Sequence, residues 1–470
     1  MSRAAIVAAT AWLDPSLSQM GKGEKAICNW DEDTLTMAVE AASNCLAAGF
    51  SGKVDTISLA STTAVFTDRS NATVIAEALE LGEAIVAAEF SGSRRAGTTA
   101  LILSVGSAAL GAETLVVASD RRSAKPGSPQ ELAYGHGAAA ITIGAGEKVI
   151  ARCVAHHSIA RDLVDQFRQS GVEEDYGLEE RWVRDEGWLK VVPSAIKAVM
   201  EKAQLQSRQI QHTIIPAPSR NVAEAIARSC GLSLESLVDA LNLVVGDTGA
   251  AHPLLMLALC LESAKVGDII LLTSFGQGCD AILLQVTEAI LNYRQMRGPI
   301  GLHKNRRLEE NYVKYLSFAG RLTAHSGMRA EHDKRTAHTV AYRKHDMISG
   351  LNGGKCSACG TVQFPRTRGC VNPQCGQFNT QEPYSLRGSP AAIKTFTEDW
   401  LAFSPCPPLF YGNIQFTNGA NIMMELTDVD PGQIAVGMPV RLLFRIKDTD
   451  DRRGFRRYFW KAAPIAAAEV

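Results

Sequence analysis

Long apolar runs are missing from the sequence, because no stretch of 18 consecutive residues is apolar throughout. No helix is therefore expected to cross a membrane. The first 20 residues contain only a short apolar run, which ends at Asp14 and Pro15, so we expect no secretory signal peptide and a cytoplasmic protein. Low-complexity segments and short-period repeats are missing as well.

An excess of charge of either sign is also missing, since 48 Lys and Arg face 49 Asp and Glu for a net charge of −1. A near-neutral chain lacks the strong positive field that attracts nucleic acid or an anionic membrane, so neither is expected as the main partner. The chain has 470 residues, 46% of them hydrophobic, which is enough for two or three buried cores.

Disulfide bonds are not expected either. Of the eleven cysteines, four cluster late in the chain and seven are scattered singly. The scattered ones are Cys28, Cys45, Cys153, Cys230, Cys260, Cys279 and Cys406. Single thiols in a chain without a signal peptide usually stay reduced and buried.

Residues 4 to about 290 alternate between strand and helix patterns. Strands are predicted at residues 4–10, 56–60, 114–120, 141–146, 148–155, 213–217, 268–278 and 280–290. Helices are predicted at residues 31–42, 70–81, 97–110, 220–232 and 248–264. Strands separated by helices of this length predict a layered α/β domain at residues 1–295.

The chain changes character after this domain. Residues 296–345 are basic and polar and predict a helical connector, which is either solvated or wraps a neighbour or an anionic ligand. Residues 346–385 hold the cysteine cluster, and residues 386–470 contain short alternating runs separated by Gly, Pro and Asn turns. These runs, at residues 393–400, 409–419, 420–428, 438–448 and 456–464, predict a small β-barrel of the OB-fold type.

The cysteine cluster has the spacing of a metal site. Cys356 and Cys359 form one pair, and Cys370 and Cys375 follow after a short hairpin. Four thiolates that converge in this way match the tetrahedral coordination of Zn²⁺ and leave no open position, so we predict a structural zinc site. The alternatives are an iron site of the rubredoxin type and four unrelated reduced thiols.

Three segments carry a resemblance to a known family, namely residues 29–42, 116–144 and 247–278. They resemble the thiolase superfamily, and in particular its compact HMG-CoA synthase-like branch. The C-terminal part resembles the zinc-ribbon/OB-fold partner that normally accompanies such enzymes as a separate chain. The resemblance implies a thiolase-like αβαβα fold, a coenzyme A thioester as substrate, and a homodimer or dimer of dimers, with a second enzyme subunit as a further possible partner.

The residues that the resemblance requires for catalysis are replaced in this chain. The family uses a Cys at a helix N-terminus as the acyl acceptor, a His and an Asn to stabilise the enolate or oxyanion, and in HMG-CoA synthases a Glu as acid/base. The matching positions carry Arg94 with Ser93 beside it for the Cys, Pro216 or Ala217 for the His, Asp247 for the Asn, and Thr62 for the Glu. The resemblance therefore implies that the usual acyl-Cys mechanism is not available.

One hypothesis keeps an enzyme but changes its reaction. Some proteins that resemble thiolases and associate with zinc-ribbon/OB-fold partners are aldolases, which cleave a β-hydroxyacyl-CoA without a covalent intermediate. Such a step needs a base and donors that stabilise an enolate. Asp247 is the candidate base, His252 follows it in the next helix, and Arg94 is the candidate for binding an oxyanion or a substrate carboxylate.

Two further hypotheses stay open. The chain is either a non-catalytic scaffold that holds a CoA channel for a thiolase or synthase, or an acyltransferase in which Ser93 or Cys279 serves as a relocated nucleophile. Each candidate also has a structural interpretation. Asp247 would cap a helix, His252 and Cys279 would pack in the core, and Arg94 would form an ion pair.

Overall fold

The computed structural model describes residues 3–8, 11–13, 23–47, 53–146, 149–297, 307–323, 325, 327–328 and 337–465. The chain divides into two compact units. Unit 1 comprises Met1–Asn29, Asp33–Ala76 and Leu81–Leu322, and unit 2 comprises Trp30–Glu32, Glu77–Glu80 and Thr323–Val470. Within the described ranges, no helix is both long and apolar enough to span a bilayer.

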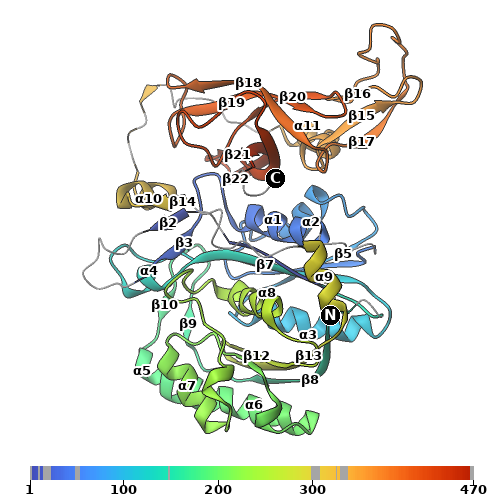
Figure 1. Ribbon diagram of the computed structural model, residues 1–470. Helices are drawn as coiled ribbons and strands as arrows, with labels where there is room; N and C mark the ends of the chain where they lie inside the picture. Colours follow the sequence, from blue (N-terminus) through green and yellow to red (C-terminus); the bar gives the residue numbers. More distant parts are fainter. Residues whose placement is uncertain are drawn as a thin grey trace. The chain divides into compact units, whose positions relative to one another are not determined.

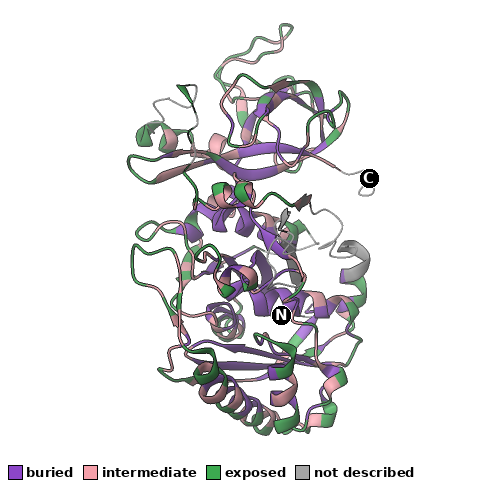
Figure 2. Ribbon diagram, turned by 90° about the vertical axis from the view of Figure 1, so that its left-hand side faces the viewer, coloured by how far each residue is buried: buried purple, intermediate pink, exposed green. Residues whose placement is uncertain are grey.

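Unit 1 contains two main sheets. The first has five strands in the order β1 (Arg3–Ala8), β7 (His136–Ile143), β6 (Thr114–Arg121), β4 (Thr56–Ala60) and β5 (Val86–Phe90). The second has four strands in the order β11 (His212–Ile214), β12 (Ile269–Phe275), β13 (Gly278–Val286) and β8 (Ala151–Ala160). Strands β7 and β12 are buried along their whole length, as expected for sheets that are covered on both faces (Figure 2).

Helices cover both faces of these sheets and give five layers (Figure 1). The central layer holds α3 (Ala96–Ala108) and α8 (His252–Ser263), α1 (Thr34–Ala47) covers the outer face of the first sheet, and α6 (Leu189–Ala203) and α7 (Arg220–Ser229) lie on the outer side of the second. Helix α8 is apolar on all sides, which suits a helix between two sheets. The predicted αβαβα layering is confirmed.

Shorter elements complete the unit. The helical ones are α2 (Asn71–Ala78), α4 (Pro129–Ala133), α5 (Glu180–Trp182), the π-helical turn Val183–Trp188, α9 (Ala289–Arg297) and α10 (Tyr312–Phe318), with 3-10 turns at Ser207–Gln209, Leu234–Ser236 and Gly249–Ala251. The short strands are β2 (Ala11–Leu13), β3 (Lys25–Ile27), β9 (Gln166–Phe167), β10 (Tyr176–Gly177) and β14 (Arg307–Glu309).

Part of the expected connector packs into unit 1. Strand β14 pairs with β2, and Tyr315 of α10 is buried against Ile27. The Nζ of Lys25 donates to the hydroxyl of Tyr315 at 3.2 Å, and Tyr312 donates its hydroxyl proton to the Glu131 carboxylate at 3.1 Å. Residues 307–319 of the connector are therefore docked rather than solvated, whereas residues 298–306 lie outside the described residues.

Unit 2 contains two smaller sheets and two short helices. The helices are α11 (His338–Arg343) and α12 (His345–Ile348). A three-stranded sheet runs in the order β16 (Val362–Gln363), β15 (Asn352–Cys356) and β17 (Gln381–Ser385). A five-stranded sheet runs in the order β20 (Asn421–Glu425), β19 (Leu409–Phe416), β18 (Ala391–Asp399), β21 (Pro439–Asp450) and β22 (Phe455–Pro464).

The expected small barrel does not close. Strand β20 is short and ends at Glu425, so its edge meets the edge of β22 through a single bridge between Leu426 and Ala462. The predicted strand positions agree with the observed ones, but the result is an open sheet. The domain bounds 1–295, 296–345, 346–385 and 386–470 stay predictions.

Candidate active site and metal centre

The N-terminus of α3 is held by a buried carboxylate from the second sheet. Asp280, on β13, accepts hydrogen bonds from Arg95 at 3.0 Å, Thr98 at 2.9 Å and Thr99 at 2.8 Å. Its side chain is 1% exposed. Asp280 therefore fixes the turn in which Arg94 stands. Sequence reasoning missed this residue, although an acid directly after the Gly-rich turn of a buried hairpin was an available signal.

Arg94 takes part in a network of ion pairs. One terminal nitrogen donates to Asp165 at 2.7 Å, and the other donates to Asp247 at 3.0 Å. Burial alone would lower the pKa of Arg94, but the two carboxylates, Asp165 above all, raise it. The residue that the resemblance places at the nucleophile position is thus a fixed cation.

A second arginine, Arg122, reaches the same carboxylate. Its Nη1 lies 2.6 Å from Oδ2 of Asp247, and its Nη2 donates to Gln166 at 2.7 Å and to Asp175 at 3.0 Å. The side chain is 0% exposed, and its guanidinium lies 3.3 Å from the ring centroid of Tyr134. No sequence motif indicates Asp165 or Asp175, and Arg122 is marked only by the Arg121–Arg122 pair at the end of a buried strand.

Asp247 is placed by a backbone bridge. Its N–H donates to the carbonyl of Ala133 at 2.8 Å, and its own carbonyl accepts from Gly135 at 3.0 Å. Residue 135 must be glycine, because a Cβ there would lie 2.0 Å from the carbonyl oxygen of Val245. The carboxylate also accepts from the N–H of Gly249 at 2.9 Å, at the start of the turn that leads into α8.

The electrostatics make Asp247 a weak base in this arrangement. Burial raises its pKa, but the guanidinium groups of Arg122 and Arg94 outweigh burial and hold the pKa well below its usual value. A carboxylate this strongly stabilised has little affinity for a proton. It gains basicity only if it separates from the two arginines.

His252 makes hydrogen bonds through both ring nitrogens. Nε2 donates to the carbonyl of Ala240 at 2.7 Å, and Nδ1 accepts from the hydroxyl of Thr248 at 3.2 Å. Burial lowers its pKa, so the ring is neutral. His252 is buried, and both of its ring nitrogens are hydrogen-bonded to protein groups, which favours its structural interpretation.

The two candidate nucleophiles lack an activating base. The hydroxyl of Ser93 donates to the carbonyl of Gly276 at 2.7 Å. Cys279 is completely buried, and burial together with the neighbouring Asp280 carboxylate raises the pKa of its thiol. Neither side chain meets the requirements of a nucleophile in this arrangement.

Thr62 and Ala217, at the family's Glu and His positions, make structural contacts. The Thr62 hydroxyl donates to Asp120 at 2.9 Å, and Asp120 also accepts from the N–H of Ala250 at 2.7 Å. Burial raises the pKa of Asp120. The carbonyl of Ala217 accepts from Asn242 at 2.9 Å. These positions thus hold loops beside the ion-pair network.

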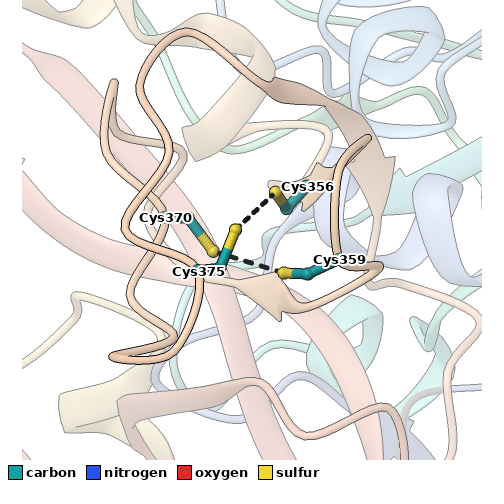
Figure 3. A group of neighbouring side chains, drawn as sticks. All are labelled: Cys356, Cys359, Cys370 and Cys375. Atoms are coloured by element: carbon teal, nitrogen blue, oxygen red, sulfur yellow. Dashed lines mark hydrogen bonds between the residues drawn. The ribbon is translucent and has the colours of Figure 1, made fainter.

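The four clustered cysteines converge on one point in unit 2 (Figure 3). Their sulfur atoms all lie within 4.8 Å of one another. The separations of Cys356 from Cys375 and of Cys359 from Cys370 are 3.9 and 3.6 Å. Tetrahedral Zn–S bonds of about 2.3 Å require sulfur separations of about 3.8 Å, so the cluster fits a zinc ion.

Family models match three parts of the chain. Residues 200–286 match the C-terminal domain of 3-oxoacyl-[acyl-carrier-protein] synthase III. Residues 351–380 match the rubredoxin-like zinc ribbon domain of ChsH2, and residues 387–445 match the C-terminal OB-fold domain of ChsH2. The predicted zinc ribbon and OB-fold domains are confirmed.

Curated proteins match up to about two thirds of the chain. The hydroxymethylglutaryl-CoA synthase of Aeropyrum pernix is 31% identical over 321 residues, which cover 66% of this chain and 88% of that protein. The hydroxymethylglutaryl-CoA synthase of Archaeoglobus fulgidus is 30% identical over 281 residues, which cover 58% of this chain and 81% of that protein.

Solved structures show the same fold at lower identity. An HMG-CoA synthase complexed with CoA aligns with a TM-score of 0.60 at 16% identity, over 72% of this chain and 94% of that one. The 3-oxoacyl-(acyl carrier protein) synthase III of Pseudomonas aeruginosa PAO1 aligns with a TM-score of 0.55 at 21% identity, over 61% and 98%.

Proposed function

Since the chain belongs to the hydroxymethylglutaryl-CoA synthase family, we propose that it forms or breaks a carbon–carbon bond in a coenzyme A thioester without a covalent acyl-enzyme. The reaction is of the aldolase type on a β-hydroxyacyl-CoA. One observation carries the proposal. The position that the resemblance assigns to the nucleophile, at the start of α3, holds Arg94, paired with Asp247, and among the described residues Ser93 and Cys279 contact no activating base.

The proposed roles follow from the contacts of the two arginines. In the cleavage direction the β-hydroxyl gives its proton to a base, and the bond between Cα and Cβ breaks. The β-carbon leaves as an aldehyde or ketone, and the electron pair forms an enolate that is then protonated at Cα. Arg94 and Arg122 supply the positive charge that stabilises the developing oxyanion. Asp247 acts as the base once it separates from them, because its pKa then rises towards its usual value.

A non-catalytic scaffold is the second candidate. The charges of the network balance within the protein, since three arginines, Arg94, Arg122 and Arg168, are paired with three aspartates, Asp165, Asp175 and Asp247. A centre that is neutralised in this way does not need a substrate for stability. In this case the chain would hold a CoA channel for another enzyme.

We also propose that Cys356, Cys359, Cys370 and Cys375 hold a structural zinc ion. The ion would cross-link the hairpin of the ribbon, which has little apolar core of its own. All four ligands are thiolates, so no position is left open for catalysis.

The test is intact-protein mass spectrometry with acetyl-CoA and acetoacetyl-CoA, followed by β-hydroxyacyl-CoAs with detection of the released aldehyde or ketone. We expect no acyl adduct and a carbonyl product from at least one β-hydroxyacyl-CoA. Arg94→Gln should reduce turnover by about 100-fold, the usual loss of one oxyanion donor, and Ser93→Ala should leave it within about twofold. An adduct on Ser93 or Cys279 would establish an acyltransferase instead. If no β-hydroxyacyl-CoA is turned over, the non-catalytic scaffold is the interpretation that remains.

The proposed assembly is a homodimer through the edge of the first sheet. Among the described residues β5 pairs only with β4, and its Val86 side chain is 62% exposed. Two copies that pair this edge across a two-fold axis would close the assembly. We expect a dimer in multi-angle light scattering and a shift towards monomer in Val86→Lys. A monomeric wild type would contradict the homodimer and leave this edge for a second enzyme subunit.

A further inference from the structure

We propose that the five-stranded sheet of unit 2 carries a recognition site for an acidic segment, and that the chain's own residues Trp30–Glu32 occupy it. The chain enters unit 2 twice before it reaches Thr323, at Trp30–Glu32 and at Glu77–Glu80. Asn29 and Asp33, which flank the first segment, belong to unit 1. Binding of these three residues therefore keeps unit 2 attached to the rest of the chain independently of the connector.

Asp31 is the residue of the segment that is bound most closely. Its Oδ2 accepts hydrogen bonds from the Nζ of Lys461 at 3.0 Å and from the hydroxyl of Thr427 at 2.9 Å. Its carbonyl accepts from the N–H of Ile446 at 2.9 Å. The side chain is 0% exposed. Burial alone would raise the pKa of Asp31, but Lys461 and Arg445 outweigh it and lower the pKa, so the carboxylate is charged.

The residues on either side of Asp31 contact the same two cations. Oε1 of Glu32 lies 2.8 Å from Nη1 of Arg445, and the Nζ of Lys461 lies 4.2 Å from the ring centroid of Trp30. The side chains of Glu32, Arg445 and Lys461 are at most 2% exposed. Water competes little for buried charges, so their complementary arrangement specifies a segment in which an aromatic residue precedes two acids.

Unit 2 orients both cations with carboxylates of its own. Nη2 of Arg445 lies 3.1 Å from Asp428, and the Nζ of Lys461 lies 3.0 Å from Glu425. Arg445 therefore uses one terminal nitrogen for its own unit and the other for Glu32. Because the cations are held without the help of the segment, the site is preorganised for an acidic partner.

The site lies where the two edges of the open sheet meet. Thr427 and Lys461 are the chain neighbours of Leu426 and Ala462, which form the single bridge between these edges. The N–H of Thr427 also donates to the carbonyl of Ala462 at 2.9 Å. The segment thus binds at the one place where β20 and β22 approach each other within the described part of the sheet.

The second segment, Glu77–Glu80, provides a matched control. The carboxylate of Glu80 accepts from Asn352 at 2.7 Å and from Ser385 at 2.5 Å. Glu80 is only partly buried and Ser385 is exposed, so water competes for these hydrogen bonds. Removal of the charge of Glu80 should therefore affect the attachment of unit 2 much less than removal of the charges of Asp31 and Glu32.

The first test cuts the connector of the full chain. A specific protease site inserted at residues 329–336 allows complete cleavage after purification, and size-exclusion chromatography shows whether the two fragments stay together. We expect the wild-type fragments to co-elute at about 0.15 M and at about 1 M salt, because salt screens buried ion pairs little. Asp31→Asn combined with Glu32→Gln should raise the dissociation constant of the fragments at least about tenfold. Glu80→Gln should change it by less than about threefold.

The second test supplies the segment as a separate molecule. A fluorescent peptide with the sequence of residues 26–36 is added to the uncut chain, and its anisotropy measures binding. The wild-type chain should bind the peptide poorly, because its own segment occupies the site at a high effective concentration. The Asp31→Asn, Glu32→Gln chain should bind it at least about tenfold more tightly, since its own segment competes less well. A peptide with the same two substitutions should show no such difference.

Either test can overturn the recognition site. Separation of the wild-type fragments after cleavage, or equal dissociation constants for the wild type and the folded double variant, would contradict it. Equal binding of the peptide to the two chains would contradict it as well. A shift of the double variant from dimer to monomer in light scattering would mean that the segment of a second copy occupies the site instead.

A variant on the side of unit 2 keeps the test decisive if the double variant does not fold. Thr427→Val removes one hydrogen bond to Asp31 at nearly constant volume and should raise the dissociation constant of the cut fragments about tenfold. An unchanged constant would contradict the site. Circular dichroism establishes that each variant is folded. None of these measurements depends on turnover, so failure of the proposed reaction would leave the recognition site unaffected.

Discussion

Replacement of Arg122 with methionine is expected to lower the free energy of unfolding by about 3 kcal/mol, the lower end of the cost of removing one partner from a buried ion pair. Arg122 is fully buried and contacts both Asp247 and Asp175. Loss of Arg122 leaves the negative charges of these two carboxylates with less positive charge nearby to offset them. Asp247 retains Arg94 at 3.0 Å, whereas Asp175 retains Arg168 at 3.9 Å and the side-chain amide of Gln166 at 3.4 Å. Urea denaturation followed by circular dichroism measures the change.

A surface ion pair provides the matched control for this prediction. Arg220 pairs with Glu224 at 3.0 Å, but its side chain is 66% exposed. Arg220→Ala should therefore change the free energy of unfolding by less than about 0.5 kcal/mol. Adding Asp247→Asn to Arg122→Met should recover part of the lost stability, because one unpaired charge is then removed. An effect of Arg122→Met as small as that of the control would mean that solvent already screens the network.

The secondary structure of unit 1 follows from local sequence wherever the elements are buried. Strand β4, Thr56–Ala60, was predicted at its observed bounds, because a short apolar run between polar segments fits a strand buried on both faces. The helix predicted from residue 31 begins at Thr34 instead. Asp33 accepts from the N–H of Leu35 at 2.9 Å and of Thr36 at 3.0 Å, so it precedes the helix as its cap.

The members of the ion-pair network could be predicted only in part. Arg94 and Asp247 were identified because they replace family residues within recognisable segments. Arg122 lies within the segment 116–144 that carries the resemblance but at a position without an expected role, Asp165 and Asp175 stand in segments without a motif, and the fold alone brings the three together. A pattern along the chain does not reveal which charges meet when the partners of Arg94 and Arg122 lie 53 to 153 positions away.

The roles of the candidates depend on their partners more than on their residue types. His252 was a reasonable acid/base candidate from sequence, yet its Nε2 donates a hydrogen bond to the carbonyl of Ala240. Cys279 was a reasonable nucleophile, yet its position inside β13 raises the pKa of the thiol. Both differences arise from burial, which depends on the packing of distant segments and is not visible at the residue itself.

Removal of metal from the four-cysteine cluster is expected to unfold the ribbon while unit 1 stays folded. Three short strands, one of them only the two residues Val362–Gln363, give this region a small apolar core. Binding of a structural zinc contributes about 10–16 kcal/mol in zinc-finger peptides, so its loss leaves too little to order the hairpin. Elemental analysis before and after treatment with a chelator gives the metal content. Hydrogen exchange should then show loss of protection in β15 and β17, with β6 and β12 unchanged.

Cysteine variants separate the metal from general effects of thiol loss. Cys359→Ser removes one ligand and should reproduce both the loss of zinc and the loss of protection. Cys406→Ser, outside the cluster, should change neither, because its thiol lies beyond the group of converging sulfur atoms. If the purified protein contains iron instead of zinc, the four thiolates form a rubredoxin-type iron site with the same geometry. If the ribbon keeps its protection from hydrogen exchange after complete metal removal, the contacts of β15 with β16 and β17 are sufficient to keep it folded. The metal would then occupy the site without holding the fold.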